Sequence, residues 1–309
     1  MKKILLALVV LLVVGAGALA WSFRPQVLPV SGDTAIAIPA VSPPADMKVS
    51  VLHTGKMFSK AGFAYRGGAL GEERIFGMAA ILVQHPQGAL LIDAGFGRNV
   101  EAHALTTPWL MRKTSRLEKE PPAADQLRAA GFDPGQLRGI LLTHAHWDHV
   151  SGVEDFPGVP VWVPQAERDF IASGHIAATL AASFGNVAWR IYDFPDGPYL
   201  GFDSSYDVFK DGTVVVVPAP GHTPGSVITF VTPPGARRYA FVGDLVWQRE
   251  GVEIPAERPW LSRRLVDGDA ASVRTWIVRM HALAGSVPGL VIVPAHDRRV
   301  LETLPKFGS

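Results

Sequence analysis

Side chains that bind metal ions are concentrated in one short segment near the middle of the sequence, which reads His-Ala-His-Trp-Asp-His. It contains His144, His146, Asp148 and His149. On an extended segment, His144 and His146 point to the same side, so both imidazoles can reach one cation. Asp148 and His149 are adjacent, and a turn there can direct them to a second cation. Burying so many ionisable groups without a partner is costly, so the segment predicts a metal site.

Four other apolar runs in the sequence also end in a histidine or an aspartate. These residues are Asp93, His222, Asp244 and His296. Loops at the carboxyl ends of strands in α/β sheets converge on one crevice. Taken singly, His222 or His296 can be a hydrogen-bonded loop histidine and Asp244 can cap a turn. Their common position favours metal ligands, and a carboxylate such as Asp244 can bridge two cations.

The remaining histidines have no such context, and we expect them on the surface or satisfied in the core: His53, His85, His103, His175 and His281. The chain has no cysteine, so a metal here must be held by histidine and carboxylate. The 29 Lys and Arg residues balance 28 Asp and Glu residues. This balance gives no reason to expect a nucleic acid or an anionic membrane as partner, and a small-molecule substrate is expected instead.

The amino terminus has the pattern of an export signal. Lys2 and Lys3 precede an apolar run over residues 4–20 that ends Ala-Leu-Ala. This pattern predicts a signal peptide over residues 1–20, with cleavage after Ala20 favoured and a periplasmic or secreted protein as the product. The alternative is an uncleaved membrane anchor, because the run reaches the short end of the range of about 17–25 residues that spans a bilayer. Residues 21–46 are predicted to be a Pro/Ala-rich linker, and residues 47–309 the folded domain.

Short apolar runs alternate with helical stretches after Met47. We expect strands over residues 49–52, 79–84, 89–92, 139–142, 159–163, 213–217, 239–242 and 290–293, and helices over residues 123–130 and 273–284. The turn residues 85–88 join two of these strands in a hairpin. Continuous apolar runs suit strands that are covered on both faces, so the sequence predicts an α/β fold with helices outside the sheets.

The segment Thr143–Gly152, Thr-His-Ala-His-Trp-Asp-His-Val-Ser-Gly, resembles the signature of the metallo-β-lactamase-fold hydrolases. The four residues at the ends of the other apolar runs fall where that family has its other motifs. The resemblance extends from Met47 to Asp297. It implies an αββα sandwich of two mixed β-sheets flanked by helices, with a two-metal site at one edge.

The resemblance also implies roles for the candidate ligands. A first metal would be bound by His144, His146 and His222, and a second by Asp148, His149 and His296. Asp244 would bridge them, and Asp93 would orient a ligand imidazole through a hydrogen bond. Two Zn²⁺ ions are the expected cofactor, with iron or manganese open.

Two such cations would lower the pKa of a shared water and generate hydroxide for attack on a carbonyl or a phosphorus, with Asp148 as the catalytic group at the leaving atom. The complete ligand set resembles lactonases and glyoxalase II-like thioesterases more than true β-lactamases, which generally lack the bridging aspartate. An ester, lactone or thioester substrate is therefore expected first. The alternatives are a phosphodiesterase or β-lactamase of the same fold, and an exported metal-binding protein without turnover.

Substrate selection is expected outside the ligand loops. Quorum-quenching lactonases of this fold typically carry tyrosine three residues after the bridging aspartate, where this chain has Trp247, so an acyl-homoserine lactone substrate is in doubt. Residues 100–120 are expected to form a helix or a lid near the mouth of the site. For the aromatic residues within 183–209, packing in the core is the favoured interpretation, and an apolar pocket wall is the alternative.

Overall fold

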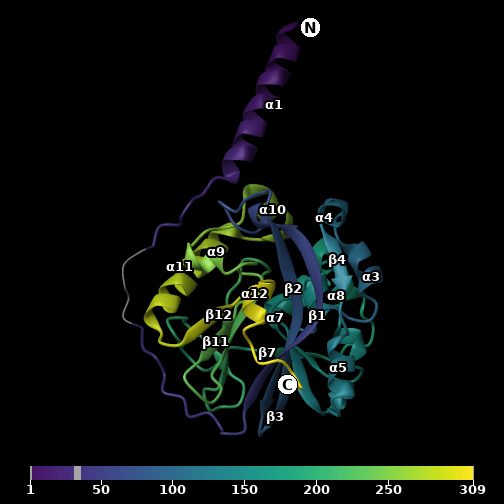
Figure 1. Ribbon diagram of the computed structural model, residues 1–309, viewed down its shortest axis with the longest axis vertical. Coiled ribbons are helices and arrows are strands. Elements are labelled where there is room, and N and C mark those ends of the chain that lie inside the picture. The colour runs from purple at the N-terminus through teal and green to yellow at the C-terminus, as the bar shows by residue number, and fades with distance from the viewer. Residues whose placement is uncertain (1, 31–35, 309) are drawn as a thin grey trace.

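Two β-sheets pack face to face, with helices on their outer faces (Figure 1). The structure is a computed structural model, and it describes residues 2–30 and 36–308. Within these residues the first sheet has the strand order β4-β1-β2-β3-β5-β6-β7. Its strands are β1 (Lys48–Lys60), β2 (Glu73–His85), β3 (Gly88–Ile92), β4 (Arg116–Lys119), β5 (Leu137–Leu141), β6 (Val161–Pro164) and β7 (Trp189–Tyr192). The second sheet, in the order β12-β11-β10-β9-β8, consists of β8 (Tyr206–Asp207), β9 (Val214–Pro218), β10 (Val227–Val231), β11 (Arg238–Phe241) and β12 (Leu290–Val293).

Both sheets are mixed. In the first sheet β4, β1, β2 and β3 pair antiparallel in that order, and β3, β5, β6 and β7 pair parallel. In the second sheet β8 to β11 pair antiparallel, and β12 adds a parallel strand. The arrangement confirms the predicted αββα sandwich of two mixed β-sheets flanked by helices.

The side-chain alternation in β9 shows why the apolar runs are continuous. Val214 and Val216 pack into the core between the two sheets, whereas Val215 and Val217 pack against the outer helix α11 (Ala270–Ser286). Both faces of the strand are therefore buried, as period-two alternation requires of a strand between two apolar layers. The buried apolar residues of α11 recur every three or four positions: Val273, Ile277, Met280 and Leu283.

The outer face of the first sheet is covered by α5 (Ala123–Ala129), α7 (Gln165–Ala172) and α8 (Thr179–Ser183). Leu127, Ile171 and Leu180 of these helices pack in one apolar cluster with residues of the first sheet, such as Leu82 and Ile140. Shorter helices occupy the connections: α2 (Ala61–Ala64), α3 (Val100–His103), α4 (Trp109–Thr114), α6 (Trp147–Val150), α9 (Glu250–Glu253), α10 (Trp260–Val266) and α12 (Arg298–Leu301).

Every strand and helix expected from the apolar runs has a counterpart, with ends that shift by a few residues or, in β1 and β2, by more. The expected hairpin is present, since β2 and β3 pair antiparallel and Gly88 has a φ of +121° at the turn. The sequence analysis did not predict β10, whose apolar run is interrupted by Thr229. It also did not predict the short, largely polar edge strands β4 and β8 or the edge strand β7.

The amino-terminal helix α1 (Lys2–Ser22) projects away from the sandwich (Figure 1). The chain that follows has no helix or strand before β1 in the described residues. Within it, Leu28 is buried and Ile36 packs against the apolar cluster around the second sheet. The predicted limits of signal peptide, linker and domain, and cleavage after Ala20, stay predictions.

Candidate metal centre

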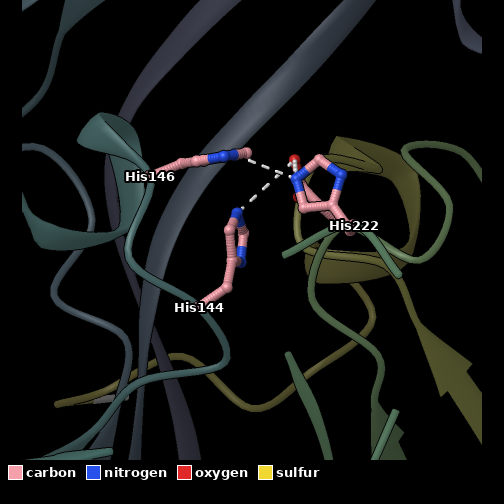
Figure 2. A group of neighbouring side chains, drawn as sticks. His144, His146 and His222 are labelled. Carbon is pink, nitrogen blue, oxygen red and sulfur yellow. Dashed lines mark hydrogen bonds and ion pairs between the residues drawn. The ribbon is translucent and has the colours of Figure 1, made fainter. Parts of the chain in front are cut away.

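Seven side chains converge at the edge where both sheets end. Their potential ligand atoms form two groups, and within each group all atoms lie within 4.8 Å of one another. Figure 2 shows three imidazoles of the first group facing one another. The first group is His144, His146, His222 and Asp244, and the second is Asp148, His149 and His296. The structure thus brings together all the residues that the sequence analysis singled out as candidate ligands.

Each candidate ligand lies in a loop or a helical turn just beyond a strand. The loop after β5 carries His144 and His146 and continues into the single turn of α6, which holds Asp148 and His149 side by side. Three other ligands follow strands of the second sheet: His222 follows β9, Asp244 follows β11 and His296 follows β12. The cluster is therefore contributed by both sheets.

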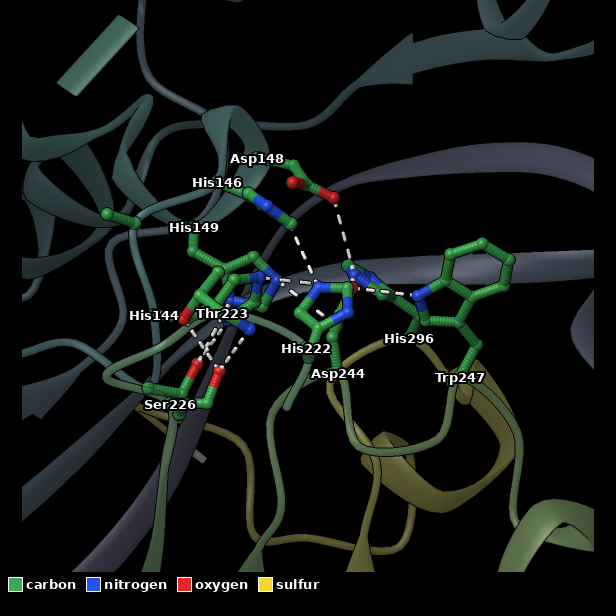
Figure 3. A network of polar contacts seen from close by, with 12 residues as sticks. His144, His146, Asp148, His149, His222, Thr223, Ser226, Asp244, Trp247 and His296 are labelled. Atoms are coloured by element: carbon green, nitrogen blue, oxygen red, sulfur yellow. Dashed lines mark hydrogen bonds and ion pairs between the residues drawn. The ribbon is translucent and has the colours of Figure 1, made fainter. Parts of the chain in front are cut away.

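Asp244 belongs to the first group but contacts histidines of both groups, one group with each carboxylate oxygen (Figure 3). Its Oδ1 is 2.9 Å from His296 Nε2 and 3.2 Å from His149 Nε2. Its Oδ2 is 3.5 Å from His222 Nε2 and 4.0 Å from His144 Nε2. A carboxylate in this position can be shared by two cations.

Several atoms of the cluster are buried without a hydrogen bond of good geometry among the described residues. They are His144 Nε2, His149 Nε2 and Asp244 Oδ1. An unsatisfied buried polar atom costs about 1–3 kcal/mol. Imidazole nitrogens and carboxylate oxygens are also the donors that Zn²⁺ accepts, and one cation in each group would satisfy them. The residues present therefore fit a pair of divalent cations.

The charges in the cluster are consistent with this fit. Burial and then the neighbouring imidazoles lower the pKa values of His144 and His146 well below the usual range, so both rings are neutral. Burial alone would raise the pKa of Asp244, but His296 and His149 hold it well below its usual range. The pKa of His149 is raised, because Asp93 and Asp244 outweigh the effect of burial. An ionised carboxylate thus lies at the centre of the cluster and attracts positive charge.

Asp93 holds one ligand and its loop in place. Its Oδ2 lies 2.7 Å from His149 Nδ1 and accepts a hydrogen bond from Thr143 Oγ1 at 2.8 Å, and its Oδ1 accepts one from the Thr143 amide at 2.7 Å. The contact with an imidazole is the one that the resemblance implied for this residue. Gly243 lets the next loop approach, because a Cβ there would lie 2.8 Å from Thr143 Cβ.

His222 and His296 have outer partners as well. Asp267 Oδ1 lies 2.9 Å from His222 Nδ1 and is paired with the buried guanidinium of Arg258, also at 2.9 Å. The Gly77 carbonyl lies 3.1 Å from His296 Nδ1. Such contacts fix the ring orientation and leave the other nitrogen for a metal. The sequence analysis missed Asp267, since an aspartate between a valine and a glycine carries no distinguishing signal.

Glu167, on α7, joins the two loops that carry the three histidines of the first ligand group. Its side chain is fully buried and accepts hydrogen bonds from the Ala145 amide at 2.6 Å, Thr223 Oγ1 at 2.7 Å and the Gly225 amide at 3.0 Å. Gly225 permits this approach, because a Cβ there would lie 2.2 Å from the Glu167 amide nitrogen. The sequence analysis missed Glu167, which reads as an ordinary acid in the first turn of a helix.

A cavity of about 310 Å³ opens above the cluster. Asp148 and Trp247 line it, and its walls are mostly apolar. The predicted lid region 100–120 contributes Leu110 and Met111 to the wall. None of the aromatic residues within 183–209 lines it, so the packing interpretation holds for that stretch. The indole Nε1 of Trp247 donates to Asp244 Oδ2 at 2.7 Å (Figure 3).

An αββα sandwich with histidine and aspartate ligands at one edge defines a class of metal-dependent hydrolases. The profile of the metallo-β-lactamase superfamily matches residues 77–296, and the chain belongs to this superfamily. A probable metallo-hydrolase of Mycobacterium tuberculosis is 31% identical over 252 residues, which cover 74% of this chain and 78% of the relative. The comparisons confirm the predicted enzyme class, a metal-dependent hydrolase.

Lactonases are among the similar proteins. An N-acyl homoserine lactonase of Rhizobium johnstonii is 25% identical over 84% of this chain and 97% of its own length. A solved N-acyl homoserine lactone hydrolase with N-hexanoyl-L-homoserine at its catalytic metal centre shares 18% identity and a TM-score of 0.65, over 85% of this chain and 98% of its own. A dizinc quorum-quenching lactonase shares 16% identity and a TM-score of 0.53, and the match covers 84% of this chain and 90% of the lactonase. These two structures support the fold.

Proposed function

We propose that this chain is a binuclear zinc hydrolase that acts on the carbonyl of an ester, lactone or thioester with an apolar acyl group. The observation that carries the proposal is the direct opening of an apolar cavity onto the ligand cluster. His146, Asp148, Asp244 and His296 line the same cavity as Met57, Phe76, Leu110 and Met111. An apolar substituent would be held by the walls while its carbonyl faces the ligands. The lactonase relatives support this substrate class, and the dizinc neighbour supports two zinc ions.

The side chains present suggest how the reaction would be organised. Cations held by the two ligand groups would lower the pKa of water and polarise the substrate carbonyl. The chain itself would orient the substrate, because the apolar walls of the cavity exclude water around the acyl group. Asp148 borders the cavity, and its Oδ2 is 3.3 Å from His296 Nε2. We propose that Asp148 takes up the proton that the attacking water gives up and delivers it to the oxygen or sulfur that leaves.

The charge of the cavity lining also bears on which of the substrate classes of this fold is favoured. No lysine or arginine lines it in the described part of the chain. A phosphodiester substrate would be expected to meet such a side chain, because phosphate is recognised by paired basic groups. A neutral carbonyl substrate with an apolar substituent suits this lining better.

A panel assay tests the proposed function. The full chain, loaded with Zn²⁺ or with Mn²⁺, is assayed on lactones, carboxylic esters, thioesters, phosphodiesters and a β-lactam. We expect turnover of the carboxylic substrates that chelation and His146→Ala both abolish. Bound metal without turnover of any substrate would favour the metal-binding alternative, and turnover that survives chelation would exclude a metal hydrolase.

Trp247→Phe tests the contact between the indole and Asp244. Phenylalanine keeps the apolar wall but removes the N–H that donates to Asp244 Oδ2. We expect kcat/KM to fall about 10-fold with little change in KM. Trp260→Phe is the matched control, because Trp260 does not line the cavity, and it is expected to leave both constants unchanged. A rise in KM alone would indicate that Trp247 binds substrate instead.

A further inference from the structure

The helix α1 projects away from the domain (Figure 1), and its apolar side chains are exposed. Its most apolar stretch of 18 residues has a mean hydropathy of 2.8, and no part of that stretch is buried. Leu5 and Leu12, for example, are 64% and 72% exposed. A helix of 21 residues can cross a hydrocarbon layer of about 30 Å. A cleaved export signal has the same composition, so the contacts at its end decide between the two interpretations.

The junction between α1 and the domain is held by partly buried contacts to one buried arginine. Arg66 is only 5% exposed, and its guanidinium donates to the carbonyls of Trp21 and Arg24, each at 3.2 Å. The same guanidinium lies 4.8 Å from the centre of the Trp21 ring and 3.7 Å from the Glu257 carboxylate. The end of α1 is therefore part of the fold, which gives the helix a defined direction.

Cleavage after Ala20 would disrupt this junction. It would cut α1 within its last turn and remove the Leu19 carbonyl that accepts from Ser22 Oγ at 2.7 Å. It would also make Trp21, whose carbonyl and ring contact the Arg66 guanidinium, the free end of the chain. These contacts favour a helix that remains attached.

Exposed apolar and basic side chains lie on the two helices at the end of the domain from which α1 leaves. The helix α10 lies beside the end of α1, and α4 lies at the same end of the domain (Figure 1). Trp260 opens α10 and is 50% exposed, Trp109 opens α4 and is 66% exposed, and Leu105 just before α4 is 70% exposed. Arg264 and Lys113 near the ends of the two helices are exposed as well. Tryptophan together with basic residues is typical of surfaces that rest at the interface of a bilayer.

The cavity above the metal centre lies between these two helices. One part of its wall comes from α10 and another from α4, and the candidate metal ligands line it as well. The wall residues of the two helices include Leu261, Leu265, Val266, Leu110 and Met111. The cavity therefore lies next to the surface that carries the exposed tryptophans.

We propose that α1 anchors the protein in a phospholipid bilayer, and that the face formed by α10 and α4 rests on that bilayer and admits amphiphilic esters or lactones from it. The proposal rests on the hydrolase function proposed above and specifies its substrates. Lys2 and Lys3 favour a cytoplasmic amino terminus, which places the domain on the exported side. An apolar tail then passes from lipid into an apolar cavity without exposure to water.

Site-specific fluorescence tests the orientation independently of activity. The chain has no cysteine, so single cysteines introduced as Trp260→Cys, Trp109→Cys or, as a control, Ile191→Cys can each carry one polarity-sensitive dye. Ile191 is 46% exposed on β7, away from α1 (Figure 1). The full chain is placed in vesicles of phosphatidylcholine and phosphatidylglycerol that contain nitroxide-labelled lipid. We expect quenching at positions 260 and 109 and none at 191.

Three results would overturn the proposal. Two come from the fluorescence experiment: equal quenching at all three positions, or no quenching at positions 260 and 109. The third is a membrane-free protein whose amino terminus is Trp21, found by sequencing after expression with export.

A kinetic experiment tests the route of the substrate. The variant Trp260→Ser/Trp109→Ser changes two residues that do not line the cavity. We expect its kcat/KM to fall about 10-fold for a long-chain ester presented in vesicles and to stay unchanged for a short, water-soluble ester. An equal loss on both esters would contradict entry from the bilayer. If the wild-type chain hydrolyses no ester, lactone or thioester, the proposed function fails, whereas the fluorescence experiment still decides the orientation.

Discussion

Asp244→Asn is expected to lower kcat/KM on the order of 1,000-fold for the ester or lactone that the wild-type chain hydrolyses best. The carboxylate presents one oxygen to each ligand group, with Oδ1 2.9 Å from His296 Nε2 and Oδ2 3.5 Å from His222 Nε2. Asparagine keeps the shape of the side chain but has no negative charge and only one acceptor oxygen. One of the two groups then loses an anionic ligand.

The measurement is metal content by mass spectrometry together with steady-state kinetics. Asp155→Asn is the matched control, because Asp155 is a buried aspartate that pairs with Arg98 outside the cluster. The control is expected to keep its metal content and its kcat/KM even if it unfolds at a lower temperature. Full activity in Asp244→Asn would exclude a bridging role for this carboxylate.

Glu167→Gln is expected to weaken metal binding roughly 10- to 100-fold, although this side chain does not itself face the cluster. Glu167 Oε2 accepts from both Thr223 Oγ1 and the Gly225 amide, and a glutamine amide nitrogen cannot accept from them. The loops that carry His146 and His222 would then lose their common support. Titration with Zn²⁺ in competition with a chelator measures the change, and Asp169→Asn on the exposed face of the same helix is the control.

The same variant has a pH signature. Burial raises the pKa of Glu167 to about 7, although its three hydrogen-bond donors oppose the shift. A raised pKa in the folded state means that the stability due to this group is full below pH 4.5 and is lost as the pH rises through 7. In chelated protein, the unfolding free energy of wild type minus that of the variant should fall by about 3 kcal/mol across this range. Parallel pH curves for the two proteins would contradict the raised pKa.

The ligand cluster could be predicted from the sequence because most of its metal-binding side chains lie close together in the chain. Four of the seven candidate ligands occupy six consecutive positions, and the other three directly follow strands that read as continuous apolar runs. A strand that is buried on both faces leaves a clear pattern, as β9 does with its four consecutive valines. The position of a site at the ends of such strands then follows from the general architecture of α/β folds.

The residues that hold the candidate ligands in position, such as Glu167 and Asp267, could not be predicted in the same way. Glu167 lies 20 or more residues from the loops that it joins, and Asp267 lies 45 residues from His222. A lone acid has no local pattern that distinguishes a solvated side chain from a buried one. The cavity wall was predicted only in part. The helix α4 lies in the expected lid region 100–120, whereas α10 and β1 also supply lining and the aromatic-rich stretch 183–209 packs in the core.

The ligand cluster also joins the two halves of the sandwich. His144, His146 and His149 extend from the first sheet, whereas His222, Asp244 and His296 extend from the second. Cations held there would act as cross-links between the sheets in a chain that has no cysteine with which to form disulfides. Occupancy at 100 times the dissociation constant would stabilise the native state by about 2.7 kcal/mol for each site. Substitutions that loosen the packing between the sheets would therefore lower metal affinity, and metal availability would set how much of the protein stays folded.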